Sequence, residues 1–331
     1  MNMPGFYTHY LCGREALEKI SSQEIANIIV KHRQLYNLGL QGPDIFFFYF
    51  YLPSAETKKV KGTGSKMHAK KVASFFSCAL KYISERETSE REALLSYLCG
   101  YACHYSLDCN THPYIFYKTG FVRKGEKHTS KYVCYHRLFE TTIDFLMVSE
   151  KLGCKPAEIN GRSLIRLDSS EYYTVGCMYR SLLKDVMGID ISVEQVQRAA
   201  KEIGIAMSLF RDRTGLKRKL VYAVESVIGK YHPVSSMVHP LKLNDSRDYL
   251  NRQKAVWSLP WDIDAKSDSS FIEMFDSASS EAAHLCDAIY NCVIGNISPE
   301  KAVDIIGNRS FSTGLDCDKP LEFKYYDCIF E

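Results

Sequence analysis

The fold is decided by the stretch SEREALLSYLCGYACHYSLDCNTHP, residues 89–113. Its first four residues, Ser89-Glu90-Arg91-Glu92, form a capping-box pattern, which is typical of a helix N-terminus. Apolar residues then recur every three or four positions, the period of a helix with one buried face, at Leu94, Leu95, Leu98, Ala102 and Tyr105. Because a helix interior disfavours proline, we expect this helix to end near Pro113.

The same helical periodicity runs through most of the chain. It predicts helices over 68–87, 131–152, 171–187, 192–210, 216–228 and 271–293, and one more after Ser298-Pro299-Glu300. Gly153 is placed to end the second of these, and Ser192 begins another capping box. Alternating strand patterns with Asn-Gly or Asp-Gly turns are scarce. The sequence therefore predicts an all-α fold.

The chain has no internal repeat and no clear linker, so we expect a single helical domain over residues 1–331. Its first half, 1–150, holds the candidate site residues, and 151–331 is a helical continuation. Two long connections interrupt the helical pattern, at 37–64 and 230–270, and the second contains Trp257 and Trp261. Long ordered connections in compact domains are usually functional.

Composition excludes several classes of protein. The 331 residues include 42 Lys and Arg against 39 Asp and Glu, a net charge of +3, which argues against a dedicated DNA-binding protein. A hydrophobic fraction of 46% excludes disorder. The longest apolar run, Ile45 to Leu52, is too short to cross a bilayer, and the first residues lack a secretory-signal pattern.

The twelve cysteines do not form CxxC pairs, which favours buried, reduced thiols. Cys99, Cys103 and Cys109 are interpreted as small core residues rather than zinc ligands. With no signal sequence evident, we expect a cytoplasmic protein. The sequence does not indicate an oligomeric state.

Two histidine–carboxylate pairs are candidate metal ligands. His104 and Asp108, and likewise His136 and Glu140, are four residues apart, so each pair lies on one face of its predicted helix. A single pair of this kind is usually an ion pair. Two such pairs, with His112 one turn after Asp108, instead indicate the nitrogen and oxygen ligands of a zinc-like ion. Further candidates lie upstream in short polar or Gly/Pro-containing contexts: His9, Asp44 and His68.

In their order along the chain, these residues resemble the bacterial zinc-dependent phospholipase C family, which is related in fold to the fungal single-strand-specific nucleases. The resemblance covers residues 3–147 and rests on Thr8-His9, Gly42-Pro43-Asp44, Met67-His68, His104 with Asp108, His112, and His136 with Glu140. It implies an all-helical domain with a zinc cluster. One ion would be held by Asp44, His68, His104 and Asp108, and a second by His112, His136 and Glu140. Asp108 would bridge to a third ion that His9 also holds.

The resemblance implies phospholipase C activity, in which a zinc-activated water attacks the phosphorus of a phospholipid and releases diacylglycerol and a phosphorylated head group. Asp44 would serve as a ligand or as the catalytic general base. Secreted family members hold the third ion with an N-terminal Trp, whereas this chain begins Met1-Asn2-Met3, so we expect two or three zinc ions. Ile45 follows Asp44 where an aromatic residue would suit choline, and the head group stays open.

Two other functions remain open. A nuclease or nucleotide phosphohydrolase on the same scaffold would need stacking aromatic residues and a basic channel. A metal-stabilised helical binding protein would hold the ions without turnover. The six lysines between Lys58 and Lys71 are interpreted as a solvated loop or as a surface that steers an anionic phosphodiester or anionic membrane toward the metals. The aromatic run 46–51 is core or a wall for acyl chains.

Overall fold

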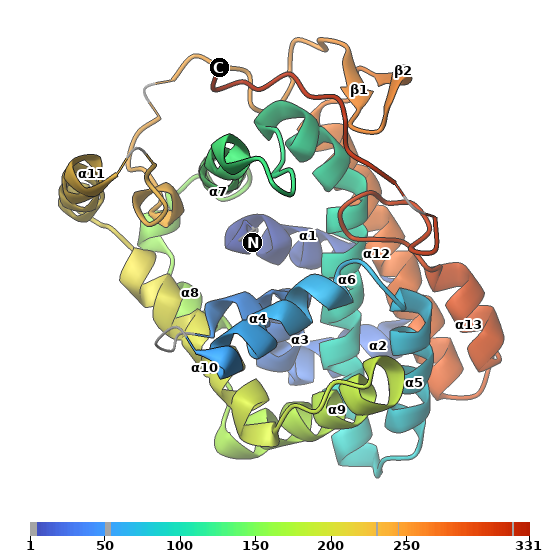
Figure 1. Cartoon of the computed structure of the whole chain (residues 1–331). Helices are drawn as coiled ribbons and strands as arrows, with labels where there is room; N and C mark the ends of the chain where they lie inside the picture. Colours follow the sequence, from blue (N-terminus) through green and yellow to red (C-terminus); the bar gives the residue numbers. More distant parts are fainter. Residues whose placement is uncertain (1–4, 50–53, 230, 244, 320) are drawn as a thin grey trace.

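The computed structural model describes residues 5–49, 54–229, 231–243, 245–319 and 321–331 (Figure 1). The first half contains α1 (Phe6–Lys19), α2 (Gln23–Lys31), α3 (Arg33–Gly39), η1 (Gly42–Phe48), α4 (Ala55–Met67), α5 (Val72–Ser84), α6 (Thr88–Thr119), η2 (Lys127–Ser130) and α7 (Lys131–Leu152). The second half contains η3 (Pro156–Glu158), α8 (Gly161–Leu164), α9 (Ser169–Met187), α10 (Val193–Phe210), α11 (Leu216–Ile228), η4 (Ser235–Met237), β1 (Trp257–Leu259), β2 (Asp262–Ser267), α12 (Phe271–Val293) and α13 (Pro299–Ile306). The all-α prediction is confirmed, with one small antiparallel hairpin added.

Helix α6 runs through the centre of the fold, with α3 and α12 packed along it (Figure 1). The α3–α6 contact is close because both helices present a glycine. A Cβ atom on Gly39 would lie 2.1 Å from the carbonyl oxygen of Tyr97, and one on Gly100 would lie 2.1 Å from that of Tyr36. Helix α3 therefore places Leu40 and the start of η1 in contact with His104 on α6.

The expected end of α6 at Pro113 is wrong, since the helix continues to Thr119. Proline has no N–H group for the carbonyl four residues earlier, here that of Cys109. The backbone at Gly314, which has φ +66°, packs so closely on this carbonyl that a Cβ atom there would lie 2.4 Å from its oxygen. The helix continues past the proline, and His112 therefore lies inside it.

The expected connection over 37–64 is also wrong, because it holds η1 and most of α4. Ser54 caps α4 by accepting a hydrogen bond from the Thr57 N–H at 3.1 Å, and the helix buries Val60 and Met67. The lysine-rich segment is therefore mainly an exposed helix face and not a loop. His68 ends α4 instead of beginning the next helix, which starts at Val72 after the left-handed Lys71 (φ 56°).

Residues 46–49 of the aromatic run are buried, as expected for core, while 50–53 lie outside the described residues. His9 lies in α1, and Asp144 of α7 binds the first turn of this helix at Thr8. The connection 230–270 contains η4 and the β1–β2 hairpin, with Trp257 buried and Trp261 stacked on Phe323.

The helices predicted over 131–152, 216–228 and 271–293 are confirmed at both ends. Gly153 ends the first of them in the left-handed conformation. All twelve cysteines are free, and Cys99, Cys103 and Cys109 are buried. Among the described residues, no helix combines the length and the apolar character that crossing a bilayer requires.

Candidate metal centre

The fold gathers all eight predicted ligand residues into one buried region. They come from five elements or element ends: His9 from α1, Asp44 from η1, His68 from the end of α4, His104, Asp108 and His112 from α6, and His136 and Glu140 from α7. Each side chain is buried. They form three groups whose ligand atoms lie within 4.8 Å of one another: Asp44, His68 and His104; His9, His104 and Asp108; and His112, His136 and Glu140.

Two of the groups share His104, and Asp108 contacts members of all three. His68 Nε2 lies 3.1 Å from Asp44 Oδ1, and His104 Nε2 lies 3.7 Å from Asp44 Oδ2. Asp108 faces His9 Nε2 with Oδ1 at 3.3 Å and His104 Nε2 with Oδ2 at 3.2 Å. Its second oxygen is also 3.6 Å from His112 Nδ1, so this carboxylate stands between the groups.

The third group is built from two neighbouring helices. His136 Nε2 on α7 lies 3.0 Å from Glu140 Oε1, one helical turn away. His112 Nε2 on α6 approaches the same oxygen at 3.4 Å. A cavity of about 20 Å³ lies against His9, Asp108, His112 and Glu140, which is room for one small species between the groups.

Backbone and hydroxyl oxygens orient four of the imidazoles. His68 Nδ1 lies 2.7 Å from the Gly64 carbonyl, His104 Nδ1 3.2 Å from that of Leu40, and His112 Nδ1 2.9 Å from that of Phe311. Because a carbonyl oxygen only accepts, each Nδ1 carries the proton. Nε2 of each ring is then directed into the cluster, and it offers a lone pair wherever the ring is neutral, an arrangement typical of metal-bound histidine.

His136 follows the same pattern through a hydroxyl. Thr119 Oγ1 donates to the Ile115 carbonyl at 2.8 Å, and its lone pair faces His136 Nδ1 at 3.5 Å. All four oriented rings thus present Nε2 inward.

Several buried polar atoms in the cluster have no hydrogen-bond partner within the described part of the chain: Asp44 Oδ2, Asp108 Oδ2, Glu140 Oε2, His104 Nε2 and His136 Nε2. Leaving buried polar atoms unsatisfied is costly. Imidazole nitrogens with carboxylate oxygens are the donor set of zinc. The residues present therefore fit bound metal ions.

The three carboxyl groups differ in the direction of their pKa shifts, because burial and neighbouring charges act on them to different extents. Burial raises the pKa of Asp44 well above its usual range. Burial acts in the same direction on Asp108, but the neighbouring His112 and His104 outweigh it and hold the Asp108 pKa well below its usual range. For Glu140, burial is likewise outweighed by His136 and His112, and its pKa is lowered.

The pKa shifts of the imidazoles also differ in direction. Burial lowers the pKa of His68 and of His104, so both are neutral at pH 7 with a lone pair for a metal. Burial also opposes protonation of His112, but Asp108 and Glu140 raise its pKa to about 9. A metal ion binding to His112 must therefore displace a proton.

Sequence reasoning missed a supporting network behind the cluster. Asp144 on α7 accepts hydrogen bonds from the Thr8 N–H at 2.7 Å, the Thr8 hydroxyl at 2.6 Å and the Tyr7 N–H at 3.1 Å. Because Gly5 provides no side-chain cap, Asp144 caps α1 from another helix and holds the turn that carries His9. His239, which had no predicted role, lies 3.0 Å from Asp144 through Nε2.

Two aromatic side chains flank the cluster. The Phe47 ring stacks on His68 with centroids 5.4 Å apart, so at this residue the aromatic run adjoins the site. Phe311, from the segment after α13, lies 5.0 Å from His68 and 5.7 Å from His104. Its carbonyl is also the partner of His112. No sequence pattern singled out Phe311.

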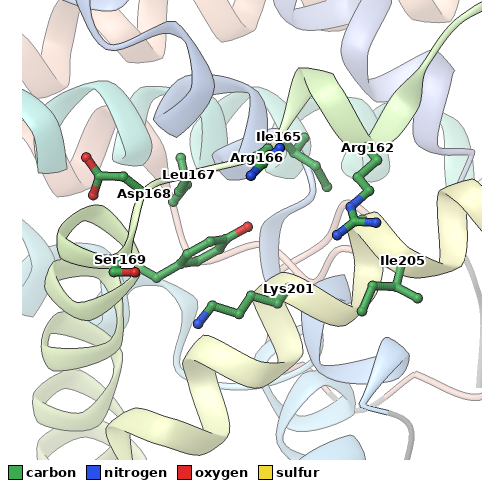
Figure 2. Close-up of a pocket in the computed structure, with 10 residues that line it drawn as sticks. Arg162, Ile165, Arg166, Leu167, Asp168, Ser169, Lys201 and Ile205 are labelled. Carbon is green, nitrogen blue, oxygen red and sulfur yellow. The ribbon is translucent and has the colours of Figure 1, made fainter.

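A larger cavity, of about 420 Å³, lies away from these residues (Figure 2). Arg162, Arg166 and Lys201 line it, and Asp168 and Ser169 stand at its edge where α9 begins. None of the eight predicted ligands lines this cavity. The Asp168 carboxylate caps α9 by accepting from the Glu171 N–H at 2.8 Å, so its role is structural.

Among known families, one described as zinc dependent phospholipase C matches residues 8–188. The matched range includes all eight cluster residues. Searches among curated proteins and among solved structures found no match.

Proposed function

The chain belongs to the zinc-dependent phospholipase C family, and on this premise we propose that it hydrolyses the phosphodiester bond of a phospholipid at a zinc cluster. The family is one of hydrolases. The observation that carries the proposal is the convergence of three groups of nitrogen and carboxylate donors, several with unsatisfied atoms, in one buried region.

The three groups correspond closely to the ligand sets implied by the sequence. Asp44, His68 and His104 would hold one ion with Asp108 beside them, and His112, His136 and Glu140 would hold another. His9 and Asp108, together with His104, would serve a third, so the number of ions is two or three. Bound zinc would supply Lewis acidity, which lowers the pKa of a coordinated water and offsets the charge of phosphoryl oxygens.

The chain's own residues would contribute orientation and proton transfer. The carbonyls of Gly64, Leu40 and Phe311 hold the imidazoles in the tautomer that ligation needs. Asp44 has one oxygen near His68 and a second with no hydrogen-bond partner in the described residues, so it can ligate or accept a proton from water. The Phe47 and Phe311 rings would exclude bulk water from that side.

The test compares two histidine variants on a water-soluble activated phosphodiester and on phospholipid. His136→Ala removes a proposed ligand, while His284→Ala changes an exposed histidine outside the cluster. We expect zinc-dependent hydrolysis that His136→Ala lowers by about a hundredfold or more, from the lost ligation, and that His284→Ala leaves unchanged. The expected lipid products are diacylglycerol and a phosphorylated head group.

Other results would overturn the proposal. Release of nucleotides from single-stranded DNA without phospholipid cleavage would assign the scaffold to a nuclease. Zinc binding with no hydrolysis of any phosphodiester would leave a metal-stabilised binding protein. The cytoplasmic location, and the role of exposed lysines such as Lys58 and Lys66 in steering anionic substrates, stay predictions.

A further inference from the structure

Helix α11 turns its apolar side away from the protein. None of its thirteen residues is buried. Val227 is 88% exposed and Ile228 80%, and three more exposed apolar side chains share this face: Leu216, Leu220 and Val224. These five residues follow helical spacing, so they form one continuous apolar stripe. In Figure 1, α11 lies at the periphery of the molecule, apart from the main group of helices.

The polar side of α11 is the side that contacts the protein. Glu225 accepts hydrogen bonds from the Val234 N–H at 2.6 Å, the Ser235 N–H at 3.0 Å and the Ser235 hydroxyl at 2.6 Å. At the other end, Asp212 accepts from the N–H groups of Gly215 at 2.9 Å and Arg218 at 2.8 Å. The outward orientation of the apolar stripe is therefore fixed by hydrogen bonds at both ends.

The segment that contains α11 is strongly basic. Residues 211–228 include five Lys or Arg against two Asp or Glu, a net charge of +3. The two acidic residues are Asp212 and Glu225, whose carboxylates are occupied by the hydrogen bonds above. Arg213 and Lys219 are exposed and form no ion pair within the described residues. Tyr231, which is 40% exposed just after α11, adds an amphipathic ring that favours a membrane–water interface.

We propose that α11 is a docking helix for an anionic phospholipid surface, with the apolar stripe inserted at the level of the acyl chains and the exposed Arg213 and Lys219 against lipid phosphates. A second copy of the chain fits less well. A twofold interface would place the same segment of charge +3 against itself. The charge of an anionic bilayer complements this segment instead.

Docking through α11 would place the membrane on the side of the protein where the connection after α11 is attached to α7. The connection that follows α11 is bound to α7: Thr141 Oγ1 donates to the Ser236 carbonyl at 2.9 Å, and Arg137 donates to the Pro233 carbonyl at 3.2 Å. These α7 residues adjoin His136 and Glu140 in the sequence. The benefit to lipid hydrolysis rests on the proposed function, whereas the docking itself does not require turnover.

The test measures co-sedimentation of the zinc-loaded chain with vesicles of phosphatidylserine and phosphatidylcholine, and with phosphatidylcholine alone. The variant Val227→Gln/Ile228→Gln removes the two most exposed stripe residues. Val30→Gln makes the same kind of change at an exposed position of α2, where Val30 is 63% exposed. We expect binding to the anionic vesicles that the double variant lowers by about tenfold or more, since two apolar side chains leave the bilayer. Val30→Gln should bind as the unaltered chain does.

Three results would overturn the proposal: no binding of the unaltered chain to anionic vesicles, equal binding of the double variant, or a solution dimer that the double variant converts to monomer. Activity on the water-soluble phosphodiester separates this inference from the proposed function. Vesicle binding without that activity would sustain docking and refute hydrolysis. The activity without α11-dependent binding would sustain hydrolysis and refute docking.

Discussion

Replacing Asp144 with alanine should destabilise the protein and disturb the metal centre together. The carboxylate is 1% exposed and accepts hydrogen bonds from Thr8 and Tyr7, and it also contacts His239. Alanine would leave the first N–H groups of α1 uncapped and His239 without its buried partner. Leaving several buried donors without their acceptor should cost about 3–5 kcal/mol in total, at about 1–3 kcal/mol for each unsatisfied group.

The assay is equilibrium urea unfolding of the zinc-loaded chain, in which the free energy of unfolding is obtained for each variant. Asp304→Ala is the control, because Asp304 is exposed near the end of α13, and we expect it to change that free energy by less than about 0.5 kcal/mol. Asp144→Asn, which retains one acceptor oxygen, should lose less than Asp144→Ala.

The effect should also reach the cluster, because His9 lies one residue after Thr8 in the capped turn. We expect Asp144→Ala to bind zinc more weakly than the unaltered chain even under conditions where it is fully folded. A loss of stability under about 1 kcal/mol, with unchanged zinc affinity, would refute the role assigned to Asp144.

Three further predictions concern the backbone and protons of the site. Gly42→Ala should lower zinc content and activity on the soluble phosphodiester by about tenfold or more. The reason is that Gly42 has φ +48° and that a Cβ atom there would lie 2.4 Å from His104 Cδ2. Unchanged zinc content by mass spectrometry would contradict this prediction. Gly39→Ala should reduce the free energy of unfolding by about 3 kcal/mol, since its Cβ atom would overlap the Tyr97 carbonyl. A urea midpoint equal to that of the unaltered chain would disprove the close contact. Zinc uptake at pH 7 should release a proton from His112, because the pKa of this residue is about 9 in the metal-free chain. The apparent zinc affinity should therefore rise as the pH rises toward 9. Calorimetric binding enthalpies that do not vary with the ionisation enthalpy of the buffer would argue against this proton release.

Local patterns in the sequence predict most of the helices. Capping residues and apolar periodicity predicted helices such as α7, α10 and α12, and Ser192 and Gly153 lie where caps were expected. The four-residue spacing of His104 with Asp108 and of His136 with Glu140 predicted side chains on one helix face, and the structure brings both pairs together.

What the sequence did not reveal depends on tertiary contacts. Pro113 indicated a helix end, whereas α6 continues through it to Thr119, and the close packing of Gly314 on Cys109 is not visible in a local window. Helix α4 was obscured by its lysines, since its short apolar pattern at Val60 and Met67 is weak. The boundaries of α11 were predicted correctly, but its periodicity does not indicate that the apolar side faces outward.

The support of the metal centre was missed for similar reasons. Asp144 continues the four-residue spacing of His136 and Glu140, which was an available signal that it shares their face of α7. Phe311 lies about 200 residues from His112 in the sequence, and no pattern could relate its carbonyl to that imidazole. Asp44 and His68 were identified by their short polar or Gly/Pro-containing contexts and by resemblance to the family, and their helical and turn positions came only from the structure.

The measurement that tests the central claim most directly is the metal content of the chain, by mass spectrometry, after purification without chelators or affinity metals. We predict two to three zinc ions per chain, and fewer in His136→Ala than in His284→Ala. One zinc ion or fewer per chain, even after zinc is added, would contradict the claim that the eight histidine and carboxylate side chains form a metal centre.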